Sequence, residues 1–214
     1  MTQTLNPDSE DARNPDLHRE ELNYLLTRKF PGAVPGKDFV CAHLVDEVSG
    51  ERIGAAIIAD WKLDADRPAP EDLHAFYEEY REDVDGFATE REAELLRSGI
   101  GQERDRRIDA GFIFNGVRYQ SRAKDRENIA GAATAALAAV VNGAEAGDYR
   151  WHGGEADFVW IAEDNSLVTM DAPTVHAFGQ AAMAHKQAHI FAARALKDSL
   201  PVPDDFADDS HWPE

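Results

Sequence analysis

Residues 111–120 read GFIFNGVRYQ and carry the clearest structural signal of the chain. Asn115 and Gly116 stand between two β-prone runs. Both central positions of a type I′ turn need a positive φ, which asparagine and glycine tolerate better than other residues. The pattern therefore predicts a tight antiparallel hairpin with Asn115 and Gly116 at its tip.

An alanine-rich helix is predicted directly after this hairpin. Between Lys124 and Asn142 apolar residues recur at helical spacing, and Gly143 is suited to the end of a helix. The many alanines allow a neighbouring element to approach this helix closely.

A further hairpin and a last helix follow. Residues 158–161 and 166–170 are β-type runs on either side of a turn that holds Asp164 and Asn165. A helix is then predicted over residues 171–198, because an aspartate and a proline at its start are typical of a helix N-terminus.

The N-terminal half predicts a short helix at 21–30 and a hairpin made of 39–45 and 53–61, the second strand ending at Trp61. Two strands alone are marginally stable in water. The hairpin therefore needs a partner, which the sequence leaves open as a helix, another sheet or another subunit.

A long, highly charged helix is predicted from Pro70 to about Ile108, with interruptions near Gly86, Gly99 and Gly101. The two later glycines are interpreted as a helix break, since no strand precedes them as a dinucleotide-binding loop requires. The apolar stripe of this helix is narrow, which is typical of a solvated helix or of a coiled-coil strand.

These elements predict an α+β fold. We expect an extended arm with a short helix over 1–37, the hairpin and long helix over 38–109 as an attachment or oligomerisation segment, a compact α+β domain over 110–200, and a solvated acidic tail over 201–214.

The composition excludes several classes of protein. The chain holds 41 acidic residues against 22 lysines and arginines, a net charge of −19, so binding to nucleic acid is not expected. A single cysteine, Cys41, permits no internal disulfide and no cysteine-clustered metal site. No apolar run is long enough for a membrane helix, so no membrane insertion is expected.

His185 and His189 are the weak candidates for a metal site, since residues four apart face one side of a helix. Lys186 stands where a zinc protease carries its catalytic glutamate. Both histidines also lie in an apolar seam at helical spacing that includes Val175, Phe178 and Leu196. The favoured interpretation is therefore a packing role, with no metal, no cofactor and no catalytic residue.

Other polar motifs favour ordinary structural roles. Trp151 precedes a glycine-rich turn and is interpreted as a tryptophan at the edge of the core, with a small-ligand or glycan loop as the alternative. Arg104, Arg106 and Arg107 form the densest basic cluster, and neighbouring acids on the same helix explain it without a bound phosphate.

Three stretches together resemble a known family: 104–120 (RDRRIDAGFIFNGVRYQ), 125–132 (DRENIAGA) and 160–172 (WIAEDNSLVTMDA). They are similar to the small C-terminal domain, of unassigned function, in tail-fibre and tail-fibre-assembly proteins of bacteriophages and prophages. The resemblance covers residues 104–198. Trp61 and residues 68–73 are also similar to linker segments of small phage tail proteins.

The resemblance implies a structural and interaction protein of a phage tail, such as a tail-tip, fibre or host-attachment component. It would be located in the virion, assembled in the bacterial cytoplasm, and would contact other tail proteins. The alternatives are a fibre-assembly chaperone that is absent from the finished particle and a metal-assisted hydrolase.

We also expect a homo-oligomer, with a trimer favoured for a fibre component. The long helix and first hairpin are poorly covered within one chain, and the seam from Val175 to Leu196 on the last helix is long enough for helices to associate. The residues expected to matter for structure and interaction are Trp61, Asn115, Gly116, Trp151, Trp160, Asp164, Asn165, Val175, Phe178 and Leu196.

Overall fold

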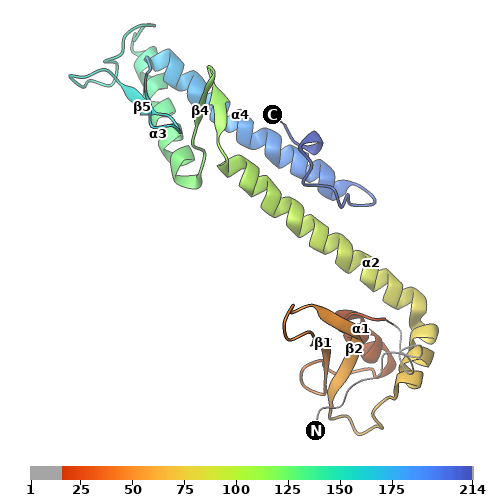
Figure 1. The fold of residues 1–214 in the computed structure, drawn as a ribbon. Helices are drawn as coiled ribbons and strands as arrows, with labels where there is room; N and C mark the ends of the chain where they lie inside the picture. The colour runs from red at the N-terminus through yellow and green to blue at the C-terminus, as the bar shows by residue number, and fades with distance from the viewer. Residues whose placement is uncertain (1–15, 214) are drawn as a thin grey trace. The chain divides into compact units, whose positions relative to one another are not determined.

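The computed structural model describes residues 16–213. Its elements in chain order are α1 (Arg19–Lys29), β1 (Phe39–Val45), β2 (Arg52–Trp61), α2 (Pro70–Asp109), β3 (Phe112–Phe114), β4 (Val117–Tyr119), α3 (Ala123–Val141), β5 (Val159–Ile161), β6 (Leu167–Thr169), α4 (Ala172–Asp198) and a 3-10 helix (Asp209–His211) (Figure 1). Within the described residues the strands form two-stranded antiparallel sheets, so the expected α+β class is confirmed.

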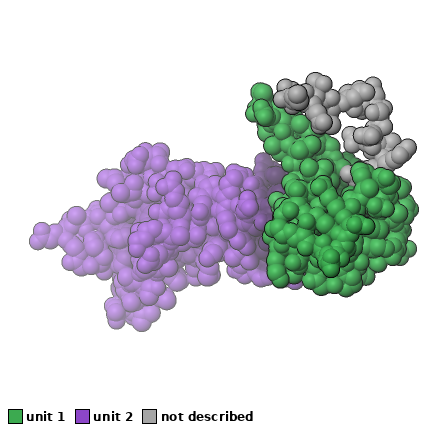
Figure 2. All heavy atoms as spheres, turned by 90° about the horizontal axis from the view of Figure 1, so that it is seen from below, with its two compact units in different colours: residues 1–92 green, residues 93–214 purple. Residues whose placement is uncertain are grey.

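The chain divides into two compact units, residues 1–92 and 93–214, and α2 contributes to both (Figure 2). The sequence predicts the boundary between the two units near residue 109, at the end of this helix. The difference arises because the second half of α2 packs on the C-terminal elements, which helical periodicity alone does not reveal. Among the described residues, no helix is long and apolar enough to span a membrane.

Unit 1 has a core of its own. The β1–β2 hairpin pairs Phe39 with Trp61 and Val45 with Arg52, and α1 packs against it (Figure 1). The expectation that this half is poorly covered within one chain is therefore wrong, because α1 and the start of α2 supply the missing partner. Its buried hydrophobic residues are Leu17, Leu22, Leu25, Leu26, Phe39, Cys41, Ala56, Ile58, Leu73 and Val84.

Helix α1 begins at Arg19, two residues before the start of the short helix predicted at 21–30. His18 caps it: the Glu20 backbone N–H donates to His18 Nδ1, and the His18 N–H donates to the Glu21 carboxylate at 2.7 Å. This reciprocal pair is a capping box, which satisfies backbone donors that a helix start leaves free. Residues 1–15 of the predicted arm lie outside the described residues.

Helix α2 is continuous where breaks were expected. Gly86, Gly99 and Gly101 all lie within it, and the irregular position is Tyr80, with φ −116° and ψ 19°. Gly99 is used for packing, since a Cβ there would lie 2.6 Å from the Phe206 ring. The glycine run therefore marks a close approach of the C-terminal segment to the helix.

Unit 2 packs two hairpins and two helices around an aromatic core. Helices α3 and α4 approach closely at Gly179, where an added Cβ would collide with the Ala133 side chain. The two hairpins are joined by a hydrogen bond from the Glu163 N–H to the Arg118 carbonyl at 3.0 Å. The predicted close approach to the alanine-rich helix is thus made by α4.

The C-terminal segment is not a solvated acidic tail. Val202 and Trp212 are buried with Ile100, Ala193 and Leu196 in a separate hydrophobic cluster. Composition was misleading because the acidic residues alternate with the apolar anchors that fix the segment.

Candidate functional site

The two hairpins and α4 meet around the ring of Phe178. Four aromatic rings have their centroids within 5.5 Å of the Phe178 ring, those of Phe112, Phe114, Tyr119 and Trp160. Such edge and offset contacts stabilise a core beyond the area they bury. This cluster fixes the hairpins on the helix.

The predicted seam of α4 lies inside this unit. Val175 and Phe178 are fully buried, and Leu196 is 7% exposed. A 3-4 apolar pattern does not say whether its partner belongs to the same chain, and here α3, β3 and the C-terminal segment occupy it. The seam is therefore not a free surface for association.

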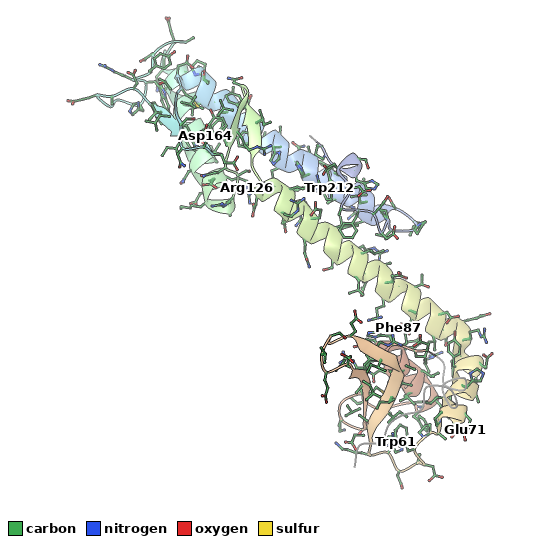
Figure 3. All side chains as sticks on the ribbon, in the orientation of Figure 1. Trp61, Glu71, Phe87, Arg126, Asp164 and Trp212 are labelled. Carbon is green, nitrogen blue, oxygen red and sulfur yellow. The ribbon has the colours of Figure 1, made fainter. Side chains whose placement is uncertain are left out.

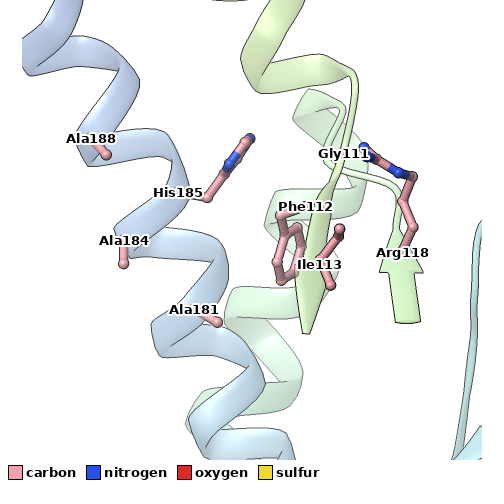
Figure 4. Close-up of a pocket in the computed structure, with 8 residues that line it drawn as sticks. All are labelled: Gly111, Phe112, Ile113, Arg118, Ala181, Ala184, His185 and Ala188. Carbon is pink, nitrogen blue, oxygen red and sulfur yellow. The ribbon is translucent and has the colours of Figure 1, made fainter. Parts of the chain in front are cut away.

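A cavity of about 420 Å³ opens beside the Phe178 cluster (Figure 4). One wall is α4 and the other is the β3–β4 hairpin. The lining residues are Gly111, Phe112, Ile113, Arg118, Ala181, Ala184, His185 and Ala188. The sequence did not predict this cavity, although the alanines at helical spacing opposite the Gly-Phe hairpin were its signal.

His185 is the polar group on the helical wall. Its ring stacks on Phe112 with centroids 6.0 Å apart, and its Nε2 atom is buried without a hydrogen-bond partner among the described residues. Burial lowers the pKa of His185, and the neighbouring His189 adds to this effect, while the backbone at Ile108 and Arg107 opposes it. The cavity is therefore apolar, with neutral His185 on one side and Arg118 on the other.

His189 does not face the cavity. It is 3% exposed, its Nδ1 lies 2.9 Å from the His185 carbonyl oxygen, and its ring stacks on Trp212. Within the part of the chain that the structure describes, no three histidine, cysteine or acidic side chains are grouped as a metal site requires. The geometry of His189 matches a packing role.

Arg107 connects α2 to the C-terminal segment. It donates to Glu103, to the Ala207 carbonyl at 2.8 Å and to Asp209 at 2.7 Å. Its guanidinium lies 5.2 Å from the ring centroid of Trp212, which is labelled in Figure 3. Arg104 and Arg106 pair with acids on their own helix, as the sequence predicted. The pairing of Arg107 with the C-terminal segment was not predicted.

The turn residues adopt the conformations that the sequence predicted. Asn115 and Gly116 have φ values of 50° and 78°, as the type I′ turn requires. Asn165 has φ 66°, and Asp164 accepts the Ser166 N–H at 2.9 Å. Hydrogen bonds from Ser166 lower the pKa of Asp164. Both turns expose polar tips above the aromatic core.

The remaining predicted tryptophans are anchored by hydrogen bonds. Trp151 Nε1 donates to the Met170 carbonyl at 3.1 Å and its ring packs on Phe158. Trp61 Nε1 donates to the Ala65 carbonyl at 2.7 Å. Both side chains are half-buried, which matches a position at the edge of each core.

Unit 1 holds a pair of histidines, His18 and His43, that the sequence did not predict as a site. The His18 and His43 rings are 4.5 Å apart. His43 Nε2 accepts a hydrogen bond from the Arg19 backbone N–H at 3.0 Å, so both rings accept hydrogen bonds from the first turn of α1. Burial lowers the pKa of each histidine, and Arg91 adds to the effect at His18.

Together these features define a two-unit α+β protein whose candidate site is an apolar cavity backed by aromatic residues. The family model for a domain of unknown function, DUF4376, matches residues 89–210, which is more than half of the chain, and the chain belongs to this family.

Residues 22–85 match the model of the XkdW protein family, which is phage-associated. The two matches meet close to the division between the two units. They are consistent with a phage-related protein. No curated protein and no solved structure matches the chain.

Proposed function

We propose that the chain is a structural and interaction component of a bacteriophage tail: a tail-tip, fibre or fibre-attachment protein. The observation that carries this proposal is the match of unit 1 to the XkdW family in the same chain as the DUF4376 domain. In this proposal the protein is located in the virion, is assembled in the host cytoplasm and contacts other tail proteins.

The proposed role is not enzymatic. The cavity beside α4 supports this view, because Arg118 and His185 are the polar side chains among a lining of glycine, alanine, isoleucine and phenylalanine. No nucleophile stands beside a base in this lining. The cavity is better suited to receive an apolar side chain of another tail protein.

The proposed contacts are with protein rather than nucleic acid. The net charge of −19 repels phosphate groups and favours partners with basic surfaces. Self-association is also part of the proposal, although the buried seam of α4 removes one reason for favouring a trimer.

The decisive experiment is quantitative mass spectrometry of purified phage particles against the lysate of the same infected culture. A tail component is expected at a fixed stoichiometry to known tail proteins in the particle. A chain that is abundant in the lysate and absent from particles would replace this proposal with that of an assembly chaperone.

A metal-assisted hydrolase is tested separately. Stoichiometric zinc that survives dialysis of the purified protein, and that is lost in His185→Ala, would contradict the non-enzymatic role. The structural proposal expects no such metal retention in either protein.

A further inference from the structure

Helix α3 presents an exposed apolar face beside its contact with α4. Ala130, Thr134, Leu137 and Val141 recur on this face at alternating steps of four and three residues. All four are exposed, Leu137 at 44% and Val141 at 79%. This spacing is that of a helix seam that packs against another helix.

The same face carries no charge. No acidic or basic residue lies between Asn128 and Ala144, in a chain of which 29% is charged. Two exposed apolar side chains outside α3 stand near charges in the sequence: Arg194 follows Phe191 by three residues on α4, and Glu163 follows Ile161 by two.

The charge of the chain determines what can cover this face. Two copies, each with a net charge of −19, repel each other wherever their acidic surfaces meet. A partner recognised through its charge would find no group to pair with here. A second copy that presents the same neutral face brings no acidic group to the contact and needs no charged group to pair with.

We propose that a second copy of this chain covers the face, with α3 packing on α3 across a two-fold axis. Such an interface is self-complementary, because both subunits contribute the same surface. This inference rests on the self-association in the proposed function and names its contact. The mass spectrometry of particles tests the tail role independently of this contact.

The order of residue sizes along the seam makes the pair antiparallel. Ala130 and Thr134 are smaller than Leu137 and Val141. In an antiparallel pair Ala130 meets Val141 of the partner subunit, and Thr134 meets Leu137 of the partner subunit. Every contact then joins a small residue to a large one, whereas a parallel pair would leave gaps at one end and crowd the other.

The mass of the full chain in solution tests the contact. Light scattering over a concentration series is expected to show a dimer that becomes monomeric in the double variant Leu137→Glu, Val141→Glu. The new carboxylates would be buried against Thr134 and Ala130 of the partner subunit without a partner charge, which should raise the apparent dissociation constant at least about tenfold. Phe191→Glu is the matched control, since it adds a charge at an equally exposed apolar site on α4.

Site-directed disulfides test the orientation. Cys41 is buried and its pKa is raised to about 12, so it provides little background reactivity. Thr134→Cys and Leu137→Cys chains, one bearing a size tag, are mixed and oxidised with copper phenanthroline. An antiparallel pair brings the two different positions within disulfide range and forms the mixed product preferentially.

The two experiments distinguish support for the antiparallel contact from its rejection. A dominant mixed disulfide together with the loss of mass in the double glutamate variant supports the proposal. Dominant disulfides between identical positions, no crosslink, or a mass that the double variant leaves unchanged would overturn it. Helical circular dichroism of each variant verifies that the substitution has not unfolded the chain.

Discussion

The carbonyl oxygen of Tyr119 lies where the side chain of any larger residue at Gly111 would begin. A Cβ on Gly111 would be in severe overlap with this oxygen, and Gly111 also has a φ of +93°. The residue joins α2 to the first strand of the Asn-Gly hairpin. The hairpin therefore returns onto α4 only because glycine is present at this position.

Gly111→Ala should destabilise the protein by about 2 kcal/mol or more, since it combines a left-handed backbone with a backbone collision. Gly116→Ala is the control, because Gly116 has a similar φ of +78° and open space around it. We expect about 1 kcal/mol there. Urea unfolding measures both, and equal losses would contradict the role given to Tyr119.

Gly179→Ala should also be destabilising, because the new methyl group would collide with Ala133 on α3. Gly131→Ala should instead stabilise by up to about 1 kcal/mol, as expected for alanine at an open helical position. The thermal midpoint of unfolding should fall in Gly179→Ala and rise in Gly131→Ala. A stabilised Gly179→Ala protein would show that the two helices are less tightly packed than described.

Arg107→Ala should cost about 1–3 kcal/mol and loosen the C-terminal segment, because a half-buried guanidinium loses Asp209, the Ala207 carbonyl and Trp212. Arg106→Ala should change stability by less than about 0.5 kcal/mol, since its side chain is exposed. Limited proteolysis followed by intact mass measurement locates the effect. Equal protection of residues 199–213 in both variants would argue against Arg107 as the anchor.

Unit 1 should lose stability between pH 7 and pH 5. His18 and His43 accept hydrogen bonds only when neutral, and folding lowers both pKa values from 6.5. The unfolded chain therefore binds more protons than the folded chain in this range. The contribution of the two neutral histidines to the free energy of unfolding is fully present above about pH 6.5, and it is lost as the pH falls through their lowered pKa values. Carboxylates remain largely ionised in this window.

The groups around the two rings support this direction. The positive charges of the nearby arginines lower the pKa values of the two histidines: Arg91 and Arg52 act on His18, and Arg52 and Arg19 on His43. The carboxylates of Glu21 and Asp16 act in the opposite direction. His18→Asn retains a capping acceptor and should flatten the pH dependence, whereas His74→Gln on exposed α2 should not. The urea midpoint of unfolding, measured at pH 7 and at pH 5 with a spectroscopic probe placed in unit 1, decides between these outcomes.

Local signals in the sequence predicted the helices and hairpins well. Asn115-Gly116 needs a specific backbone, and Asp171 caps α4 through the Thr174 N–H at 2.9 Å. Such signals act within a few residues, so one sequence is enough to read them. The four helices and the hairpin strands found in the described residues each correspond to a predicted element.

Pairings between distant residues could not be predicted in this way. The seam through Val175 and Leu196 has the same periodicity whether its partner is α3 or another subunit. The burial of Trp212 depends on Arg107 and Ile100, which are far away in the sequence. The cavity needs Gly111 beside Ala184, and no local pattern reports that meeting.

The burial of Trp212 affects the order in which parts of the chain can fold during synthesis. Because the chain is made from its amino end, unit 1 has all of its core residues long before the ribosome releases the partners of Ile100. The apolar side of α2 around Ile100 therefore stays exposed until Val202 and Trp212 have left the ribosome. Unit 1 is therefore expected to fold during translation, while the last cluster of unit 2 closes as the final step, leaving nascent chains open to chaperones at that surface.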